Sequence, residues 1–247
     1  MKGEKLMDAT KIFDTLRQRY NDATDKYPGQ VIAIATFGSQ NYGISHEDSD
    51  IDTKTILLPS RADIINGVHV SISERIYPNG INQFKDFRDV LNNIMMKGGI
   101  GFLECFYTPF FICNPNNASY WYYLSDRKVA MAHKAHEKIL HCARGLARTY
   151  YEKILQKNDF KSKIHLLWMY IFIRRFTLDN DFNRAIKLGM SYNEVRDAFS
   201  LAEPDWEQML RESFSLKEEV ENNERERFVF LEEMKTDIME AYCSELF

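Results

Sequence analysis

Four residues early in the chain have the types and the spacing needed to bind a metal ion and a phosphate group. Asp50 and Asp52 flank Ile51 in the stretch SDIDTKTIL, and Gly38 and Ser39 precede them in TFGSQNYG. Residues i and i+2 of a β-strand project from the same face, so the two carboxylates are expected to point together while Ile51 faces the core. Neighbouring carboxylates repel each other unless a cation or a proton lies between them. The pattern therefore predicts a cation site.

The expected ion is Mg²⁺ or Mn²⁺, because these ions prefer oxygen ligands and also contact substrate phosphates. Gly38 lets the backbone approach a ligand closely. Ser39, at the expected start of a short helix, offers its N–H and hydroxyl to a phosphate, aided by the helix dipole. A lone Asp-x-Asp is a weak signal that also occurs in structural turns, but here it lies between two apolar segments. The combination favours phosphoryl or nucleotidyl transfer, in which metal ions bridge the attacking and leaving oxygens.

The segments that must position these residues alternate between helical and strand patterns. Apolar residues at helical spacing predict a first helix, and short β-branched runs predict strands that end at Pro or Gly turns. The expected elements are a helix over 6–26, strands over 31–37, 51–59 and 68–76, a short helix from Ser39, a helical turn in SRADIING, and a fourth strand in INQFKDF that runs into a helix through Met96.

Beyond residue 120 the pattern becomes helical almost throughout. Helical periodicity extends over residues 126–157, 161–177, 192–213 and 216–246, with Gly189 and Pro204 as the main interruptions. The expected fold class is α+β, with an N-terminal α/β domain containing a mixed sheet at residues 1–120 and a helical domain at residues 121–247.

The order of strand, Gly-Ser, Asp-x-Asp and strand resembles the signature of the DNA polymerase β-type nucleotidyltransferase superfamily. GSQNYGISHEDSDIDTKTI is similar to the GSxxYG…SDxD form of phage and bacterial "predicted nucleotidyltransferase" families, which are like minimal nucleotidyltransferases. KDFRDVLNNIMMKGGIGFLECFYTPFFICNP resembles the segment that follows in those proteins, so the likeness covers residues 31–125. It implies an enzyme with a nucleoside triphosphate such as ATP as substrate, metal ligands at Asp50 and Asp52, and nucleotide contacts at Gly38, Ser39, Tyr42 and Gly43.

The same resemblance implies a third carboxylate, which binds a metal ion and helps to deprotonate the attacking hydroxyl. Asp86 and Glu74 are the two candidates, and Asp86 is favoured as the third catalytic residue. The alternative is a structural role, in which Asp86 lies in the first turn of a helix and its charge interacts with the helix dipole. Relatives often carry an acidic residue three positions before Asp86, and this chain has Gln83 there. That departure leaves open a different third ligand or a weakly active site.

The distribution of charge along the chain bears on which molecule carries the attacking hydroxyl, that is, on the acceptor of the reaction. The whole chain has a net charge of -4, but residues 127–196 hold 15 Lys and Arg against 6 Asp and Glu. Such a segment faces either solvent or a polyanion. The basic residues expected to hold a triphosphate or a nucleic-acid backbone are Arg144, Arg148, Lys153, Lys161, Lys163, Arg174 and Arg175.

The remaining composition is that of a cytoplasmic protein without a membrane partner. The four cysteines form no Cys-x-x-Cys pair, no secretory signal is visible, and no apolar run approaches the ~20 residues of a membrane span. The expected function is transfer of a nucleoside monophosphate to an acceptor hydroxyl, with an RNA or tRNA end favoured over a protein or a small molecule. The alternatives are an inactive module that binds nucleotide or nucleic acid, and a toxin–antitoxin-type partner that modifies a protein.

Overall fold

A computed structural model of the chain describes residues 7–70, 74–216 and 224–246. Its strands are β1 Val31–Phe37, β2 Asp52–Leu57, β3 Glu74–Tyr77, β4 Gly80–Asp86 and β5 Phe111–Cys113. Its helices in the N-terminal half are α1 Ala9–Lys26, α2 Ser39–Tyr42, α3 Arg61–Ile65, α4 Phe87–Lys97 and α5 Ile100–Leu103, followed by the 3₁₀ turns η1 Glu104–Phe106 and η2 Pro115–Asn117. The remaining helices are α6 Ala118–Asp126, α7 Lys128–Lys134, α8 His136–Lys157, α9 Phe160–Asp179, α10 Phe182–Ile186, α11 Tyr192–Leu201, α12 Trp206–Ser215 and α13 Glu224–Leu246.

The five strands form one mixed sheet in the order β3-β4-β2-β1-β5. β2 and β4 run parallel, and the other neighbouring pairs are antiparallel. The α+β class and the mixed sheet expected from the sequence are therefore confirmed. β1 and β2 are buried along nearly their whole length because helices cover both faces of the sheet.

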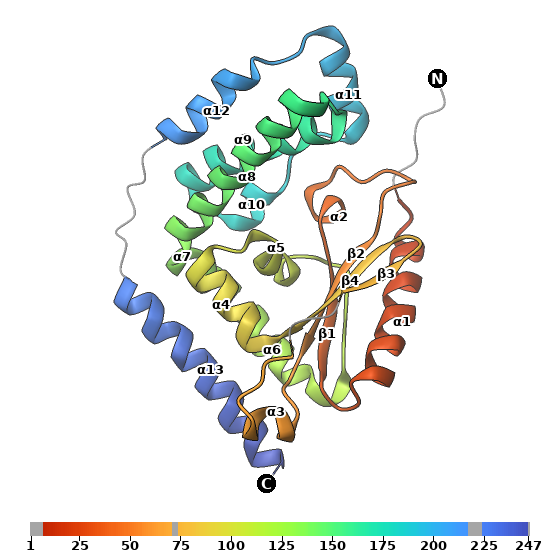
Figure 1. Cartoon of the computed structure of the whole chain (residues 1–247), viewed down its shortest axis with the longest axis vertical. Helices are drawn as coiled ribbons and strands as arrows, with labels where there is room; N and C mark the ends of the chain where they lie inside the picture. The colour runs from red at the N-terminus through yellow and green to blue at the C-terminus, as the bar shows by residue number, and fades with distance from the viewer. Residues whose placement is uncertain (1–6, 71–73, 217–223, 247) are drawn as a thin grey trace.

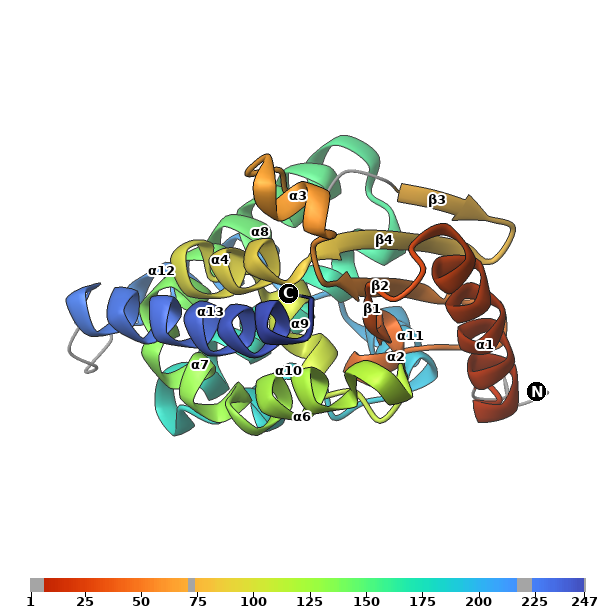
Figure 2. The same cartoon turned by 90° about the horizontal axis from the view of Figure 1, so that it is seen from below.

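α1 lies against one face of the sheet, and α4, α5 and α6 lie against the other (Figures 1 and 2). On the first face Ile12 and Leu16 of α1 pack against Ile34 and Ile51. On the second face Ala33 and other strand residues join a large core that continues into the helical half. The start of β2 is thus held from both sides.

The helical half is built on the α8–α9 pair, which lies beside the sheet domain (Figure 1). Asn158 in the left-handed conformation ends α8, and Asp159 caps the N-terminus of α9 by accepting from the Ser162 amide at 2.8 Å. This tight connection places the last turn of α8 next to the first turn of α9. α6 crosses residue 120, and one hydrophobic core includes residues from both halves. The expected division into two domains at residue 120 stays a prediction.

Several expected element boundaries change in the structure. The first helix begins at Ala9, where Asp8 caps it through the Thr10 amide, and Leu6 lies outside the described residues. The third strand covers only Glu74–Tyr77, with residues 71–73 outside the described part. β5 was not predicted from the sequence, because three residues of an edge strand give no periodic signal.

The long helical segments are also divided. The expected helix over 126–157 breaks near Arg127 and Ala135, and that over 192–213 breaks around Pro204, which cannot donate a helical hydrogen bond. Within the expected segment 216–246 the described helix starts at Glu224, and residues 217–223 lie outside the description. In the part of the chain that is described, no helix is long and apolar enough to cross a membrane.

Candidate active site

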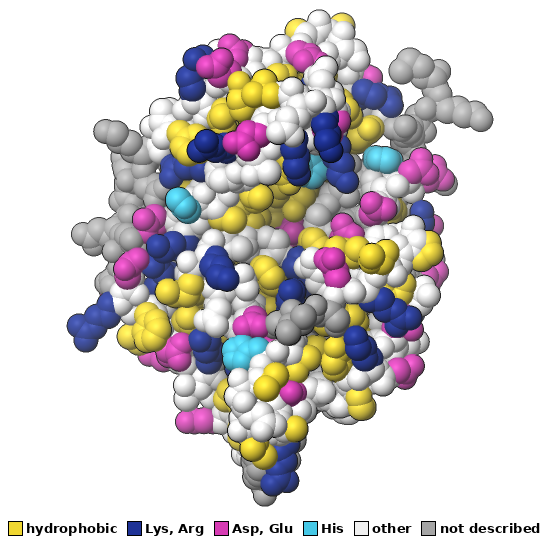
Figure 3. All heavy atoms as spheres, in the orientation of Figure 1, with side chains coloured by type: hydrophobic (Ala, Val, Ile, Leu, Met, Phe, Trp, Pro, Cys, Tyr) yellow, Lys and Arg dark blue, Asp and Glu magenta, His cyan; other side chains and the backbone are white. Residues whose placement is uncertain are grey.

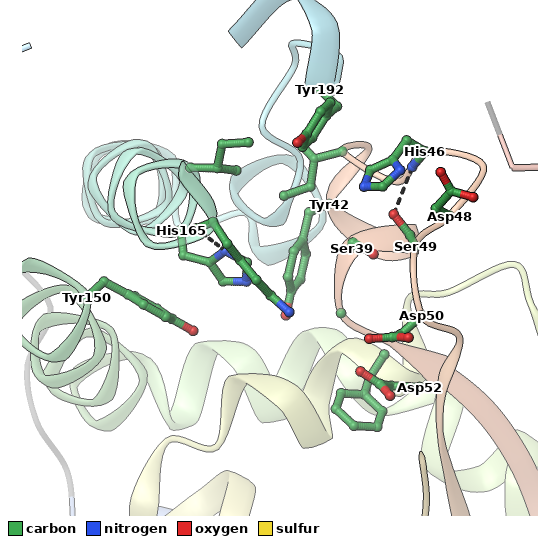
Figure 4. Close-up of a pocket in the computed structure, with 15 residues that line it drawn as sticks. Ser39, Tyr42, His46, Asp48, Ser49, Asp50, Asp52, Tyr150, His165 and Tyr192 are labelled. Carbon is green, nitrogen blue, oxygen red and sulfur yellow. Dashed lines mark hydrogen bonds between the residues drawn. The ribbon is translucent and has the colours of Figure 1, made fainter. Parts of the chain in front are cut away.

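The residues singled out in the sequence meet at a cleft between the sheet domain and the helical half. Its volume is about 420 Å³, within the size range of small-molecule sites. Figure 4 shows side chains from both halves pointing into it. Its lining is formed by Phe37, Gly38, Ser39, Tyr42, Ile44, His46, Asp48, Ser49, Asp50, Asp52, Tyr150, Lys161, Ile164, His165 and Tyr192.

Asp50 and Asp52 lie together on one wall of the cleft (Figure 4). Asp52 is the first residue of β2, and Asp50 lies in the preceding loop, while Ile51 between them is fully buried. One Asp52 oxygen, Oδ1, accepts from the Ile81 amide at 3.0 Å. Among the described residues no hydrogen bond or ion pair reaches the Asp50 carboxylate. The two carboxylates therefore keep oxygen atoms available to a cation.

A fully buried arginine fixes the backbone behind this pair. Arg19 of α1 donates to the carbonyl oxygen of Ile51, to that of Ile81 at 2.8 Å and to the Thr53 hydroxyl at 3.0 Å. It also reaches Asn79 in the turn between β3 and β4. Burial lowers the pKa of Arg19, and the charges of nearby acidic groups, Asp52 and Asp50 among them, oppose that shift. Arg19 thus adds positive charge behind two carboxylates that repel each other.

The Gly-Ser turn forms the expected short helix. Gly38 precedes α2 with φ +93°, a backbone conformation that favours glycine. A Cβ at this position would point into open space. The N–H and hydroxyl of Ser39 have no hydrogen-bond partner in the described chain. Because α2 has only four residues, its dipole is small, and individual N–H groups rather than a helix dipole remain for a phosphate. Gly43 ends α2 in the left-handed conformation and does not line the cleft.

The helical half holds α2 from its C-terminal end. The Lys187 ammonium donates to the Asn41 carbonyl at 2.6 Å, and the Leu188 amide donates to the Tyr42 carbonyl at 3.0 Å. The Tyr42 ring stacks on Trp168 of α9 with 3.6 Å between centroids. The position of the Gly-Ser turn therefore depends on the helices that follow it by more than a hundred residues.

A buried acid lies under the same turn. Glu104 of η1 accepts from the Gly38 amide and from the Tyr42 hydroxyl, both at 3.2 Å through Oε1, while Oε2 has no hydrogen-bond partner. Burial raises the pKa of Glu104 to about 7, opposed in part by nearby Lys54. Glu104 is thus a buried, hydrogen-bonded acid. It also occupies the N–H of Gly38, a residue that the resemblance implied as a nucleotide contact.

Lys54 lies two residues after Asp52 in β2, so the two side chains project from the same face of the sheet. It is only 4% exposed, and its ammonium lies 3.0 Å from the centroid of the Phe37 ring. Desolvation lowers the pKa of Lys54, while Glu104 and Asp52 oppose that shift. Phe37 lines the cleft, so this aromatic ring separates the buried lysine from it.

The opposite wall comes from the helical half and has the opposite charge. Lys161 and His165 of α9, Tyr150 of α8 and Tyr192 of α11 line it. Lys153 lies near His165, since its charge lowers the pKa of that imidazole. An anion inside the cleft would therefore face cations on one side and a metal-binding carboxylate pair on the other.

Asp86, the favoured third carboxylate, does not line this cleft. It lies opposite Leu57, the last residue of β2, whereas Asp52 is the first. Its side chain caps α4 through the Arg88 amide at 2.9 Å and forms an ion pair with the Arg88 guanidinium at 2.6 Å. The alternative expected from the sequence was an Asp in the first turn of a helix, and Asp86 lies just before that turn, as the N-cap residue of α4.

The other candidate, Glu74, also lies away from the cleft. It is exposed on the edge strand β3, where its Oε1 accepts from the side-chain Nε2 of Gln83 at 2.8 Å. Gln83 lies beside Lys54 in the β2–β4 register, which places it on the face that carries Asp52. The position expected to hold an acid near the pair therefore holds an amide. Across the described residues no group of three or more His, Cys, Asp or Glu side chains could hold a metal ion.

Most of the basic residues expected to bind an anion are occupied within the fold. Arg144 donates to the Ser213 and Leu216 carbonyls at 3.1 and 2.8 Å, Lys163 pairs with Glu203, and Arg175 donates to the Lys187 carbonyl. Only Lys161 of the seven lines the cleft.

No family model matches this chain, and no curated protein matches it. The site must therefore be judged from its own geometry.

The sequence predicted the acidic wall of the cleft, formed by Asp50 and Asp52. It did not predict most of the cationic wall, which Lys161 and His165 form with Tyr150 and Tyr192. His165 and Tyr192 have no motif around them, because they approach Asp50 only through the packing of α9 and α11 on α2, whereas His46 lies within the Gly-Ser to Asp-x-Asp segment and was overlooked. The one available signal was the excess of Lys and Arg over residues 127–196, which pointed to the segment but not to the residues.

Proposed function

We propose that the protein is a metal-dependent nucleotidyltransferase of the polymerase-β type, which transfers a nucleoside monophosphate from a nucleoside triphosphate to an acceptor hydroxyl. The observation that carries the proposal is a single cleft with the Asp50 and Asp52 carboxylates on one wall, Ser39 beside them, and the Lys161 ammonium on the other. Such an arrangement suits a ligand that carries several negative charges and brings its own divalent ions.

The two carboxylates fit Mg²⁺ or Mn²⁺. Asp50 has no partner among the described residues, and Asp52 uses one oxygen for the Ile81 amide. Mg²⁺ commonly binds through one or two carboxylates and takes its other ligands from substrate phosphates and water. When bound, the ion would neutralise charge that develops on the phosphates during transfer.

The protein's own residues would then bind and orient the triphosphate. The N–H and hydroxyl of Ser39 donate to a phosphate oxygen, and Lys161 neutralises charge from the opposite wall. Tyr150 and Tyr192 offer aromatic surface to a nucleobase or ribose. The acceptor oxygen attacks the α-phosphorus, the bond from that phosphorus to the bridging oxygen breaks, and pyrophosphate leaves.

The proposed acceptor is the end of an RNA. The corner where α8 ends and α9 begins carries the exposed Lys153, Lys157 and Lys161, and Lys161 lines the cleft. Figure 3 shows Lys and Arg side chains along the upper border of the hollow on this face. Cations at the mouth of an active site suit a nucleic-acid backbone. A protein or small-molecule acceptor would need no such rim.

The direct test uses ATP, GTP, CTP and UTP labelled either at the α- or at the γ-phosphate, with Mg²⁺ and total RNA, a protein lysate or buffer alone. The proposal expects α-label to appear in an acceptor and γ-label to appear only in pyrophosphate. Transfer of γ-label would indicate a kinase instead, and a chain that uses none of the four nucleotides would contradict the proposal.

A second candidate function is a module that binds nucleotide without turnover. Gln83 favours it, because an amide stands where the reaction would use a third carboxylate. The two functions differ in one measurement: a module binds Mg²⁺ and nucleotide with an affinity that depends on Asp50 and Asp52, yet releases no pyrophosphate.

A further inference from the structure

His165 is held in one tautomer at the wall of the cleft that faces the two aspartates (Figure 4). Its Nδ1 lies 2.8 Å from the carbonyl oxygen of Lys161, one helical turn earlier in α9. A carbonyl oxygen only accepts, so Nδ1 carries the hydrogen and Nε2 keeps a lone pair. The side chain is half-buried and packs beside Tyr150 at 4.9 Å between ring centroids.

The surroundings of this imidazole keep it neutral. Burial lowers its pKa most, and the cations of Lys161 on its own helix and Lys153 on α8 lower it further. The Lys161 carbonyl and the Asp159 carboxylate oppose this shift. The other titratable groups that line the cleft are Tyr42, His46, Asp48, Asp50, Asp52, Tyr150 and Tyr192. His165 therefore presents an unprotonated nitrogen near neutral pH.

The proposed reaction needs a group that accepts the proton of the attacking hydroxyl, and the sheet does not supply one at the expected place. Gln83 cannot take a proton, Asp86 is bound to Arg88, and Glu74 is exposed on the edge strand. Asp50 and Asp52 are committed to metal ions in the proposed function. Of the remaining groups at the cleft, His165, His46 and Asp48 are those whose chemistry suits a base, and His165 is the one whose ring tautomer is set by a hydrogen bond to a carbonyl oxygen.

We propose that His165 is the general base of the nucleotidyl transfer and replaces the missing third carboxylate. This inference rests on the proposed function. Nε2 accepts the proton from the acceptor hydroxyl as the oxygen forms its bond to the α-phosphorus. The bond to the bridging oxygen breaks with its electron pair, pyrophosphate leaves, and the protonated imidazole returns its proton to solvent.

The test compares His165→Asn with wild type. The Asn side-chain amide can still donate to the Lys161 carbonyl, so the local fold is preserved while the base is removed. His141→Asn is the matched control, because His141 is an exposed histidine of α8 that does not line the cleft. Pyrophosphate release from ATP, GTP, CTP and UTP is followed between pH 5 and 9 with Mg²⁺ and total RNA.

General-base catalysis contributes roughly 10²- to 10⁴-fold, so kcat should fall by that factor in His165→Asn and stay within about threefold in His141→Asn. In wild type kcat/KM should fall as the pH drops below the ordinary histidine pKa of 6.5, and this dependence should vanish in the variant. The Kd for α,β-methylene-ATP with Mg²⁺ should stay nearly unchanged. A loss of rate that matches a loss of affinity, or a pH dependence removed by Asp48→Asn instead, would overturn the assignment.

Imidazole ¹⁵N spectra provide a readout that does not depend on turnover. Wild type with Mg²⁺ and α,β-methylene-ATP should show His165 protonated on Nδ1 alone at pH 7.5, and a second proton on Nε2 would exclude it as a base. A protein that binds no nucleotide would contradict the proposed function itself. If the protein binds nucleotide and shows the expected tautomer, but His165→Asn retains the wild-type kcat, only the assignment of His165 as general base would be contradicted.

Discussion

Glu104 accepts a hydrogen bond from the Gly38 amide over 3.2 Å, and so ties a buried carboxyl group to the Gly-Ser turn of the cleft. Burial raises the pKa of Glu104 from 4.5 to about 7. The folded protein therefore keeps a proton that the unfolded chain releases between these two values. This group's contribution to stability is fully present below pH 4.5 and is lost as the pH rises through 7.

Glu104→Gln should consequently be more stable than wild type above pH 7 and similar to it near pH 4.5. A shift of this size corresponds to on the order of 3 kcal/mol at pH 8. Urea unfolding of both proteins at a series of pH values measures the difference. Glu207→Gln on α12 serves as the control, since Glu207 is 62% exposed and pairs only with Arg211. Equal stability of Glu104→Gln and wild type at pH 8 would show that Glu104 titrates normally.

Arg19 should be among the residues whose replacement destabilises the fold most. Arg19→Met fills a similar volume but removes the charged donor from the Ile51 and Ile81 carbonyl oxygens, at about 1.5–3 kcal/mol for each hydrogen bond. Chemical denaturation should therefore show a loss of at least ~3 kcal/mol. Arg17→Met, two residues away, provides the comparison, because Arg17 is 68% exposed and pairs only with Asp14. It should change stability by less than about 0.5 kcal/mol. A similar, small effect of both substitutions would contradict the role of Arg19.

Ser39 and Lys161 should each contribute to triphosphate binding from opposite walls. A hydrogen bond to a charged group contributes ~1.5–3 kcal/mol, so Ser39→Ala and Lys161→Gln should each raise the Kd for Mg²⁺ and α,β-methylene-ATP roughly ten- to hundredfold. Titration calorimetry measures the change. Ser45→Ala and Lys157→Gln are the matched controls, since neither residue lines the cleft. Unchanged affinity in both cleft variants would place the triphosphate elsewhere.

RNA binding should depend steeply on salt if the lysine rim contacts the phosphate backbone. Each contact with a single strand contributes a slope of about -0.7 in log K against log salt. Lys153→Gln combined with Lys157→Gln should therefore flatten the slope by about 1.4. Arg144→Gln should instead lower stability, because Arg144 holds the Ser213 and Leu216 carbonyls. Filter binding of labelled tRNA and oligonucleotides across a salt series decides between these expectations. Absence of binding at low salt would exclude RNA as the acceptor.

The sequence predicted what local patterns determine. The strand over 31–37, the helix start at Ser39 and the strand that leads into α4 match the structure, because apolar periodicity and turn residues act over a few positions. Asp50 and Asp52 reach the same cleft because of their spacing alone. The fourth strand was found, but the position of Asp86 at the far end of β2 was not, because the register of β4 against β2 depends on pairing that no local pattern reveals.

The residues of the cationic wall could not be predicted from local sequence patterns, because tertiary contacts place them at the cleft. Lys161 and His165 approach Asp50 because Trp168 stacks on Tyr42 and Lys187 binds the Asn41 carbonyl. These contacts join segments more than a hundred residues apart. An exposed lysine and a lysine committed to the fold also look the same in sequence, as Lys161 and Lys163 show.

The central claim is that Asp50 and Asp52 bind the metal ion that accompanies a nucleoside triphosphate. The most direct measurement is calorimetric titration of α,β-methylene-ATP with Mg²⁺, and again with EDTA, into wild type and Asp52→Asn. Asn keeps an oxygen that accepts from the Ile81 amide, so the fold should be retained. Asp48→Asn controls for the loss of one negative charge at the same cleft. The account predicts binding that requires Mg²⁺, is lost in Asp52→Asn and persists in Asp48→Asn. Equal Mg²⁺-dependent affinity in all three proteins would contradict it.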